Sequence, residues 1–369
     1  MADSVRAATA ALLIICSITA CSDDPHDDWS RLGGADAPIY ALQEFRGRLV
    51  FGGEFTRVDA FGDDIEVHHL AAFADAENRA LDPEVWDVLP HVTDAAGTWY
   101  NIEPEPNGNV NAMTIFRGEL IVAGAFTYVG PVRANGVARW NGFEWHALGD
   151  SVSGGGVQGT VYALANDGDQ VLYVGGNLSA AGGSAVRNVA QWNGAAWAPM
   201  DAGTNGTVYA LHARARQLFA GGAFSEAGGA PANHIASWTG LRWLPLDVGV
   251  DGTVRALTTW RGSLIAGGDF TTVNGFEMNH VARWIGVGWL TMNGGLEAAD
   301  AVTALAVNGE ELWAGESRTV GSRLLDAWDG TSWEGRLDGD GSALTGMSVG
   351  SYGVAASMET EGGAELWRR

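Results

Sequence analysis

Residues 140–145 read Trp-Asn-Gly-Phe-Glu-Trp, and variants of this six-residue pattern recur at 192–197, 238–243, 284–289 and 328–333. Each copy begins and ends with Trp and keeps Gly at its third position. The opening Trp residues follow one another at intervals of 52, 46, 46 and 44 residues. A period of this length, built from short apolar runs and Gly-rich turns, predicts a supersecondary unit repeated around a central axis, with one four-stranded sheet per unit.

Each repeat predicts four β-strands. The unit reads Val-x-Ala-Leu, then Leu-x-x-Gly-Gly-x-Phe, then an Ile/Val-Ala-x-Trp run, and finally Trp-x-x-Leu or Met. Alternating apolar residues with frequent Gly favour strands, and no convincing helical run is found. The first segment recurs seven times, at 39–42, 110–113, 161–164, 208–211, 254–257, 302–305 and, in degraded form, 344–347. The sequence therefore predicts an all-β fold, a single β-propeller of seven four-stranded blades, with six blades as the alternative.

The two ends of the chain predict how the array closes. After residue 343 only three strand-like segments remain, so the last sheet lacks its outer strand. Residues 29–33, Trp-Ser-Arg-Leu-Gly, match the fourth-strand pattern but precede any first strand. We expect this segment to complete the last sheet and to cover an edge that would otherwise stay open.

The Trp pattern also carries a packing expectation. Asn-Gly between two strands favours a two-residue turn, which would place Trp140 opposite Phe143 and Trp145 opposite Ala138. A large side chain would then pack against a small one in most units. Because the Trp residues recur in nearly every unit, we interpret them as core rather than as a ligand platform.

Taken together, the Gly-Gly pair, the aromatic residue of the third strand and the Trp that opens the fourth resemble kelch repeats, particularly those of secreted bacterial kelch-like propellers. The resemblance covers about 29–367, within a predicted propeller domain of 29–369. It implies a propeller of six or seven blades. It implies little about activity, since kelch propellers include enzymes, adaptors and structural proteins.

The composition argues against nucleic acid as a partner. The formal net charge is −23, which would repel phosphate backbones and anionic lipid surfaces. The two cysteines, Cys16 and Cys21, both lie near the N-terminus, so no thiolate catalyst or cysteine-based metal site is expected in the propeller.

The N-terminus predicts export. Residues 1–20 have the length and apolar stretch of a signal peptide, and Ile18-Thr19-Ala20-Cys21 resembles the lipobox of bacterial lipoproteins. The resemblance implies cleavage before Cys21 and its lipidation, with 21–28 as a tether. We expect a monomer anchored in the bacterial cell envelope, at the outer membrane or cell surface, with a secreted protein as the alternative.

Loops on one face of the propeller are the expected binding surface, because variable loops on a rigid scaffold usually carry function. The candidate ligand-binding residues are Asp150, Asp201, Asp247, Asp251, Asp338, Asp340, Arg133 and Arg187 from these loops, and Trp86 from an insertion at 74–97. Clustered carboxylates could hold Ca²⁺ or attract cationic or polyhydroxylated ligands, or they could be solvated loop ends. His69, His234 and His280 occupy one repeat position in different units, too far apart to share a zinc ion.

Three functions remain open from the sequence. The first is a noncatalytic envelope lipoprotein that binds a protein or glycan through its acidic loop face. The second is a carbohydrate-active hydrolase or lyase that uses carboxylates at the channel mouth. The third is a purely structural envelope component. No phosphate loop, zinc-protease helix or nucleophile elbow favours the second, and no catalytic residue is assigned.

Overall fold

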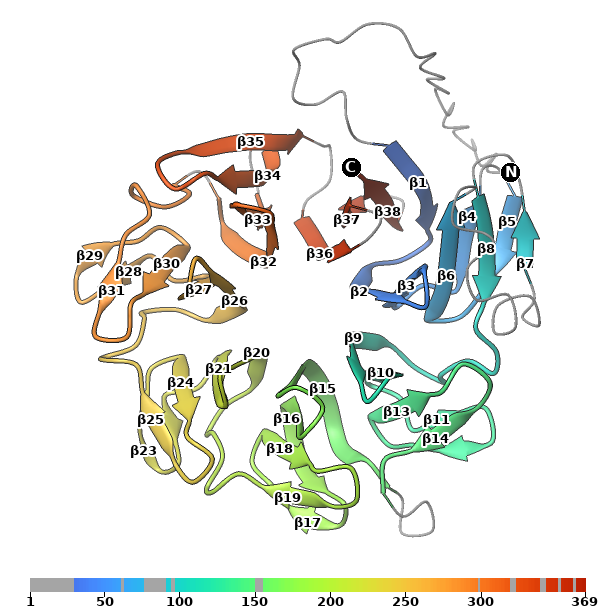
Figure 1. Cartoon of the computed structure of the whole chain (residues 1–369), viewed down its shortest axis with the longest axis horizontal. Helices are drawn as coiled ribbons and strands as arrows, with labels where there is room; N and C mark the ends of the chain where they lie inside the picture. The colour runs from blue at the N-terminus through green and yellow to red at the C-terminus, as the bar shows by residue number, and fades with distance from the viewer. Residues whose placement is uncertain are drawn as a thin grey trace, which may run out of the picture.

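All the regular secondary structure described for this protein is β-strand. The computed structural model describes residues 30–60, 63–75, 91–93, 97–149, 155–297, 299–318, 323–338, 343–350, 353–360 and 363–369. Within these ranges the strands run from β1 (Ser30–Ala35) to β38 (Gly363–Arg368), and no helix occurs. Antiparallel sheets of four or five strands, together with one ten-stranded sheet, lie side by side around a common centre (Figure 1). The prediction of an all-β, propeller-like architecture is confirmed.

All seven predicted first segments are strands, and each forms a hairpin with the strand that follows it. The first strands, which face the centre in Figure 1, are β2 (Ile39–Phe45), β9 (Val110–Phe116), β15 (Val157–Asn166), β20 (Val208–Arg214), β26 (Val254–Trp260), β32 (Ala301–Asn308) and β36 (Ala343–Gly350). Their partners are β3 (Arg48–Gly53), β10 (Glu119–Gly124), β16 (Leu172–Ala181), β21 (Gln217–Gly222), β27 (Ser263–Gly268), β33 (Glu311–Ser317) and β37 (Gly353–Thr360).

The outer strands complete the sheets. The third strands are β6 (Leu70–Asp75), β13 (Val137–Trp140), β18 (Val189–Trp192), β24 (Ile235–Trp238), β30 (Val281–Trp284), β34 (Arg323–Trp328) and β38. The fourth strands are β8 (Gly97–Asn101), β14 (Trp145–Ala147), β19 (Trp197–Pro199), β25 (Trp243–Pro245), β31 (Trp289–Leu290) and β35 (Trp333–Asp338).

Short additional strands lie in the loops between the main strands, mostly between the second and third strands. These hairpins are β4 (Arg57–Ala60) with β5 (Asp63–Glu66), β11 (Tyr128–Val129) with β12 (Val132–Arg133), β22 (Glu226–Ala227) with β23 (Ala230–Pro231), and β28 (Thr272–Val273) with β29 (Phe276–Glu277). In the third unit β17 (Ser184–Ala185) pairs with the extended β16, and in the first unit β7 (His91–Thr93) pairs with β8.

A β-bulge interrupts every first strand at the second residue of its Val-x-Ala-Leu motif. In β2 the pairing steps from Ile39 opposite Gly53 to Ala41 opposite Gly52, so Tyr40 is the extra residue. The other six first strands skip one residue at the same motif position. Because a bulge bends the strand and redirects the extra side chain, this recurrent irregularity sets which residues reach the centre of the molecule.

The Gly-Gly pair of the second strand makes room for the bulge and for the next unit. A Cβ atom on Gly267 would lie 2.5 Å from Cγ1 of Val302 in the next first strand. On Gly268 it would lie 2.0 Å from the carbonyl oxygen of Thr253, beside the bulge. Side chains at these positions would collide with neighbouring atoms, so the glycines of the motif allow adjacent units to pack closely.

The predicted register of the Trp turn is wrong. Trp140 pairs with Trp145 rather than with Phe143, and Ala138 lies opposite another Ala. The side chain of Asn141 explains the wider turn, because its Oδ1 accepts hydrogen bonds from two backbone N–H groups of the connection, including that of Phe143 at 2.8 Å. The two indoles therefore stack on each other, with ring centroids 6.1 Å apart.

In four of the five copies, the second Trp of the pattern also bonds to the preceding unit. Its indole Nε1 donates to a backbone carbonyl at or just after the preceding fourth strand: Trp197 to Leu148 (2.8 Å), Trp243 to Met200 (3.0 Å), Trp289 to Leu246 (3.3 Å) and Trp333 to Met292 (3.0 Å). The repeated Trp thus packs within its own sheet and hydrogen-bonds to its neighbour, in agreement with a core role.

The N-terminal and C-terminal strands share a sheet. β1 pairs antiparallel with β38, from Ser30 opposite Arg368 to Ala35 opposite Ala364. Leu32 is buried and packs in one cluster with residues from both ends of the chain. Residues 1–29 lie outside the described part of the chain, so the predicted pairing is observed from Ser30 onward.

β1 also bridges the last and first units. It extends to β4, with Gly34 opposite Asp59, and belongs to a ten-stranded sheet that also contains the strands of the sixth and seventh units. One residue pair, Ser317 with Ala343, joins β33 to β36 within that sheet.

Candidate functional site

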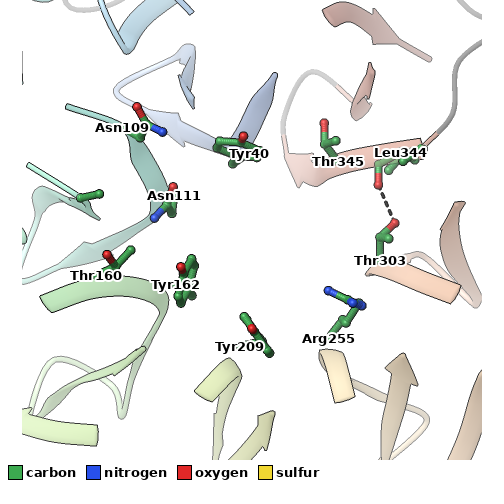
Figure 2. A pocket seen from close by; sticks show the side chains of 12 residues that line it. Tyr40, Asn109, Asn111, Thr160, Tyr162, Tyr209, Arg255, Thr303, Leu344 and Thr345 are labelled. Atoms are coloured by element: carbon green, nitrogen blue, oxygen red, sulfur yellow. Dashed lines mark hydrogen bonds between the residues drawn. The ribbon is translucent and has the colours of Figure 1, made fainter. Parts of the chain in front are cut away.

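The bulge residue of each first strand points toward the centre of the sheet array (Figure 2). The seven residues, one per unit, are Tyr40, Asn111, Tyr162, Tyr209, Arg255, Thr303 and Thr345. The motif positions on either side of them are small or aliphatic in every unit, whereas the bulge position changes from Thr to Tyr to Arg. The repeat is thus constant in its packing residues and variable where side chains meet the centre.

These side chains line a central cavity of about 530 Å³. Asn109, Thr160 and Ala125 contribute to the same wall, as do Ala343 and Leu344. The volume falls in the range of roughly 300–1,000 Å³ that is typical of small-molecule sites. Among the described residues that line this cavity none is Asp or Glu, and the one charged side chain is that of Arg255.

One part of the ring is occupied by hydrogen bonds between units. The Thr303 hydroxyl donates to the carbonyl of Leu344 at 2.5 Å, and the Thr345 hydroxyl to that of Ile39 at 2.6 Å. Nδ2 of Asn111 donates in the same way to a carbonyl of the next first strand, at 2.8 Å. We call these three residues the Thr/Asn arc. In each, the bulge side chain is short enough to reach the neighbouring backbone.

The opposite part of the ring consists of longer side chains that contact one another. The rings of Tyr162 and Tyr209 lie 5.3 Å apart at 52°, and the guanidinium of Arg255 lies 5.8 Å from the Tyr209 centroid. Arg255 also donates to the carboxylate of Asp269 through Nε and, at 2.9 Å, through Nη2. We call Tyr162, Tyr209 and Arg255 the Tyr/Arg arc.

Electrostatics differ between the members of the ring. The hydrogen bond to Asp269 raises the pKa of Arg255, so its guanidinium stays charged. Tyr40 lies between Thr345 and Asn111 in the ring, and its hydroxyl donates to Glu54 at 2.8 Å. Burial and this hydrogen bond raise the pKa of Tyr40, so its phenol stays protonated. The ring thus holds one cation, balanced by a carboxylate behind it.

The predicted acidic loop residues do not line this cavity. Asp201 and Asp247 are exposed in the turns after their fourth strands, both with φ of 55°. Asp338 is exposed at the end of β35. Arg133 in β12 and Arg187 before β18 are exposed as well. Cys21, Trp86, Asp150 and Asp340 lie outside the described residues.

Asp251 has a local structural role. Its carboxylate accepts hydrogen bonds from the backbone N–H groups and the hydroxyls of Thr271 and Thr272, at 2.8–3.0 Å. Burial alone would raise the pKa of Asp251, but these hydrogen bonds outweigh it and hold the pKa below its usual value. The same contact, to residues 20 and 21 positions ahead, recurs from Asp36, Asn107 and Asn205.

Sequence reasoning missed this recurrence, although its signal was visible. An Asp or Asn stands three positions before the first apolar residue of the first strand in these units, at 36, 107, 205 and 251. The side chain fixes the hairpin between the second and third strands of its own unit. Asp251 therefore holds a loop in place and has little capacity left to bind an ion.

No metal cluster is found in the part of the chain that the structure describes, where no three His, Cys, Asp or Glu side chains come close enough to share an ion. His234 and His280 instead place Nδ1 3.1 and 3.2 Å from backbone carbonyls of their own units. Both adopt positive φ, as His69 does, which is a backbone conformation typical of tight turns.

A buried carboxyl pair distinguishes the sixth unit. Glu316 replaces the second Gly of the motif, and Asp326 replaces the Ala found at 282 in the preceding unit. Both are almost fully buried, and Glu316 accepts a 2.7 Å hydrogen bond from Nε of Arg318. Burial, followed by the hydrogen bond and charge of Asp326, raises the pKa of Glu316 to about 9 despite Arg318. Neither carboxyl lines the central cavity, so we treat the pair as a determinant of stability.

The described residues contain no helix long and apolar enough to cross a membrane. No family model matches the sequence, and no curated protein matches it. The resemblance to kelch repeats therefore remains a resemblance of motifs.

Similarity to solved structures supports the fold. A chain of the mitotic checkpoint complex aligns with a TM-score of 0.56 at 13% identity, covering 97% of this chain and 99% of that one. The computationally designed Ika8 protein aligns with a TM-score of 0.51 at 15% identity, covering 92% and 98%. The extracellular domain of BT4673 from B. thetaiotaomicron aligns with a TM-score of 0.54 at 11% identity, covering 91% of this chain and 40% of that one. At these identities the likeness concerns the fold alone.

Proposed function

We propose that this protein is a noncatalytic binding module of the cell envelope, which holds a glycan or protein ligand at the mouth of its central channel. The observation that carries the proposal is the ring of bulge residues, which differ in chemistry while their neighbours keep the packing motif. A rigid scaffold that varies where side chains converge on a cavity suits recognition.

The proposal includes the finer architecture. Seven first strands, each with the same bulge, would correspond to seven blades of a kelch-like propeller, with β1 as the outer strand of the last blade. The pairing of β1 with β38 supports this closure. So does the hydrogen bond from Thr345 to Ile39, which joins the last first strand to the first one.

The loop face and the ring fit one binding surface. The bulge is the second residue of each first-strand motif, so the ring lies near the loops that lead from one unit into the next. Asp201 and Asp247 belong to those loops and would form an exposed rim. We propose that the ligand contacts the ring first and the acidic rim second.

Binding without turnover is favoured over glycoside hydrolysis. Hydrolysis requires two carboxyl groups about 5–10 Å apart across the scissile bond. The described residues that line the cavity supply none.

A ligand screen tests the proposal. The soluble domain, lacking residues 1–28, is applied to a glycan array and used to capture envelope proteins, in parallel with Tyr209→Ala. We expect at least one ligand whose retention depends on Tyr209. Ligands retained equally by both forms, or measured turnover of a captured glycan, would contradict it.

Export and lipidation at Cys21 complete the proposal, on the basis of the lipobox-like sequence. Mass spectrometry of the mature N-terminus should find a lipid-modified residue 21, and Cys21→Ala should release the protein from membranes. An unmodified N-terminus before residue 21 would contradict lipidation and leave the binding proposal standing.

A further inference from the structure

We infer that the Tyr/Arg arc is a subsite for an uncharged sugar ring. The inference rests on the proposed binding function and specifies its ligand. It follows from two features of the arc: an aromatic surface that is open to the cavity, and a cation whose charge is already balanced.

The aromatic surface comes from neighbouring first strands. Tyr162 in β15 is 38% exposed, and its ring is tilted against that of Tyr209 in β20 at a centroid distance of 5.3 Å. Tyrosine combines an apolar ring with a polar hydroxyl, and two such rings side by side offer a firm contact area at little entropic cost. The apolar face of a pyranose suits this surface, while its hydroxyls need hydrogen-bond partners beside it.

Arg255 supplies those partners without net charge. A guanidinium has five N–H donors, and Asp269 takes two of them through Nε and Nη2. The remaining donors are available to ligand oxygens. The carboxylate of Asp269 neutralises the positive charge, so Arg255 at this site behaves as a polar donor rather than as an anion trap.

The same balance disfavours charged sugars. A uronate would be repelled by the carboxylate of Asp269, which lies behind the guanidinium. It would also be repelled by the protein as a whole, whose formal net charge is −23. An amino sugar would be repelled by the guanidinium of Arg255. This guanidinium lies 5.8 Å from the centroid of the Tyr209 ring and already occupies the position that a ligand cation would take over that ring. A neutral ring has neither penalty.

Polar groups continue from the arc along the wall. Thr160 and Asn109 line the same cavity on the side of Tyr162 that faces away from Tyr209 (Figure 2). Hydroxyl and amide groups both donate and accept, which matches the donors and acceptors of a sugar hydroxyl. The subsite thus has an aromatic floor with uncharged hydrogen-bonding groups beside it.

The test measures charge preference directly by isothermal titration calorimetry. The probes are neutral cello-, xylo-, malto- and manno-oligosaccharides, anionic oligogalacturonate and cationic chitosan oligomers. We expect one neutral series to bind at least tenfold more tightly than either charged series. Tyr209→Ala should weaken that binding at least tenfold, and Tyr209→Phe less than fivefold, because the ring is retained.

A second variant isolates the role of the charge balance. Asp269→Asn leaves the guanidinium uncompensated, and we expect it to raise the affinity for oligogalacturonate at least threefold relative to the neutral series. Thermal melting of each variant checks that the fold is retained.

The outcomes separate the inference from the proposed function. Preference of the unmodified protein for a charged series, or an Asp269→Asn variant with unchanged preference, would overturn the inference. If the captured ligand is a protein or a charged glycan whose retention still depends on Tyr209, the proposed function stands and the inference fails. If no sugar probe binds and no captured ligand depends on Tyr209, both fail.

Discussion

The Thr/Asn arc and the Tyr/Arg arc occupy the same position of the same repeat, yet they do different things. Each residue is the extra one of a β-bulge and points to the central cavity. Thr303 is short and bonds to the next unit, whereas Tyr209 is too long for that contact and meets Tyr162 and Arg255 instead. The same β-bulge thus supports hydrogen bonds between units on one side of the cavity and presents exposed side chains on the other.

The comparison separates stability from recognition. Changes in the Thr/Asn arc should lower the melting temperature and leave binding intact, and changes in the Tyr/Arg arc should do the reverse. The residue at the bulge position of each unit would then indicate whether that unit contributes to stability or to ligand binding.

The largest effect on stability is expected from removing β1, the N-terminal strand that pairs with the C-terminal strand β38. Deletion of 21–34 removes most of β1 and leaves β38 with an unpaired edge. Loss of the burial of Leu32 alone costs about 2 kcal/mol, and the exposed edge should promote aggregation. Thermal melting and light scattering measure both effects.

The matched control is deletion of 21–28, which spares β1. This variant should melt and remain soluble like the protein that lacks only residues 1–20. Equal stability of the two deletions would show that β1 contributes nothing to closure.

The next effect concerns pH and the sixth unit, which contributes Thr303 to the Thr/Asn arc and follows the unit that holds Arg255. The pKa of Glu316 is raised from 4.5 to about 9, so the folded state prefers the protonated carboxyl. The stability this provides is complete below the pKa of the unfolded state and is lost progressively as pH rises toward the raised pKa of the folded state. Urea unfolding at pH 5.5, 7 and 8.5 should show this decline.

Glu316→Gln removes the titrating group but keeps its size and hydrogen-bonding atoms. We expect the decline with pH to flatten in this variant. If the variant and the unmodified protein lose stability in parallel over the same pH range, Glu316 does not titrate as described.

A smaller effect tests the Thr/Asn arc itself. Thr303→Val removes the hydroxyl that donates to the carbonyls of Leu344 and Gly315 while keeping the shape of the side chain. The expected loss is about 1 kcal/mol, because a carbonyl near the channel loses its donor. Thr160→Val, which lines the same cavity from β15, should change the melting temperature less; the reverse order would contradict the division into arcs.

Much of the fold could be predicted from the sequence, because apolar alternation and Gly-rich turns are local signals. The seven first strands lie where the Val-x-Ala-Leu motif places them. The register of the Trp turn could not be predicted from the Asn-Gly pair alone. This register depends on the Asn141 side chain, which accepts hydrogen bonds from two backbone N–H groups of the connection.

The candidate site was harder to predict, since it depends on strand register. The variable x of the motif was visible, but alternation alone does not show that a bulge turns Tyr209 or Arg255 toward the channel. Asp251 illustrates the converse. Its charge and loop position favoured ligand binding, whereas the fold brings it beside Thr271 and Thr272, which satisfy its carboxylate.

The most direct test of the division between the arcs is calorimetric titration of one captured ligand into two variants, Tyr209→Ala and Thr303→Val, alongside the unmodified protein. We expect Thr303→Val to bind within twofold of the unmodified protein and Tyr209→Ala to bind at least tenfold more weakly while melting at an unchanged temperature. Equal weakening in both variants, or weakening confined to Thr303→Val, would contradict the account.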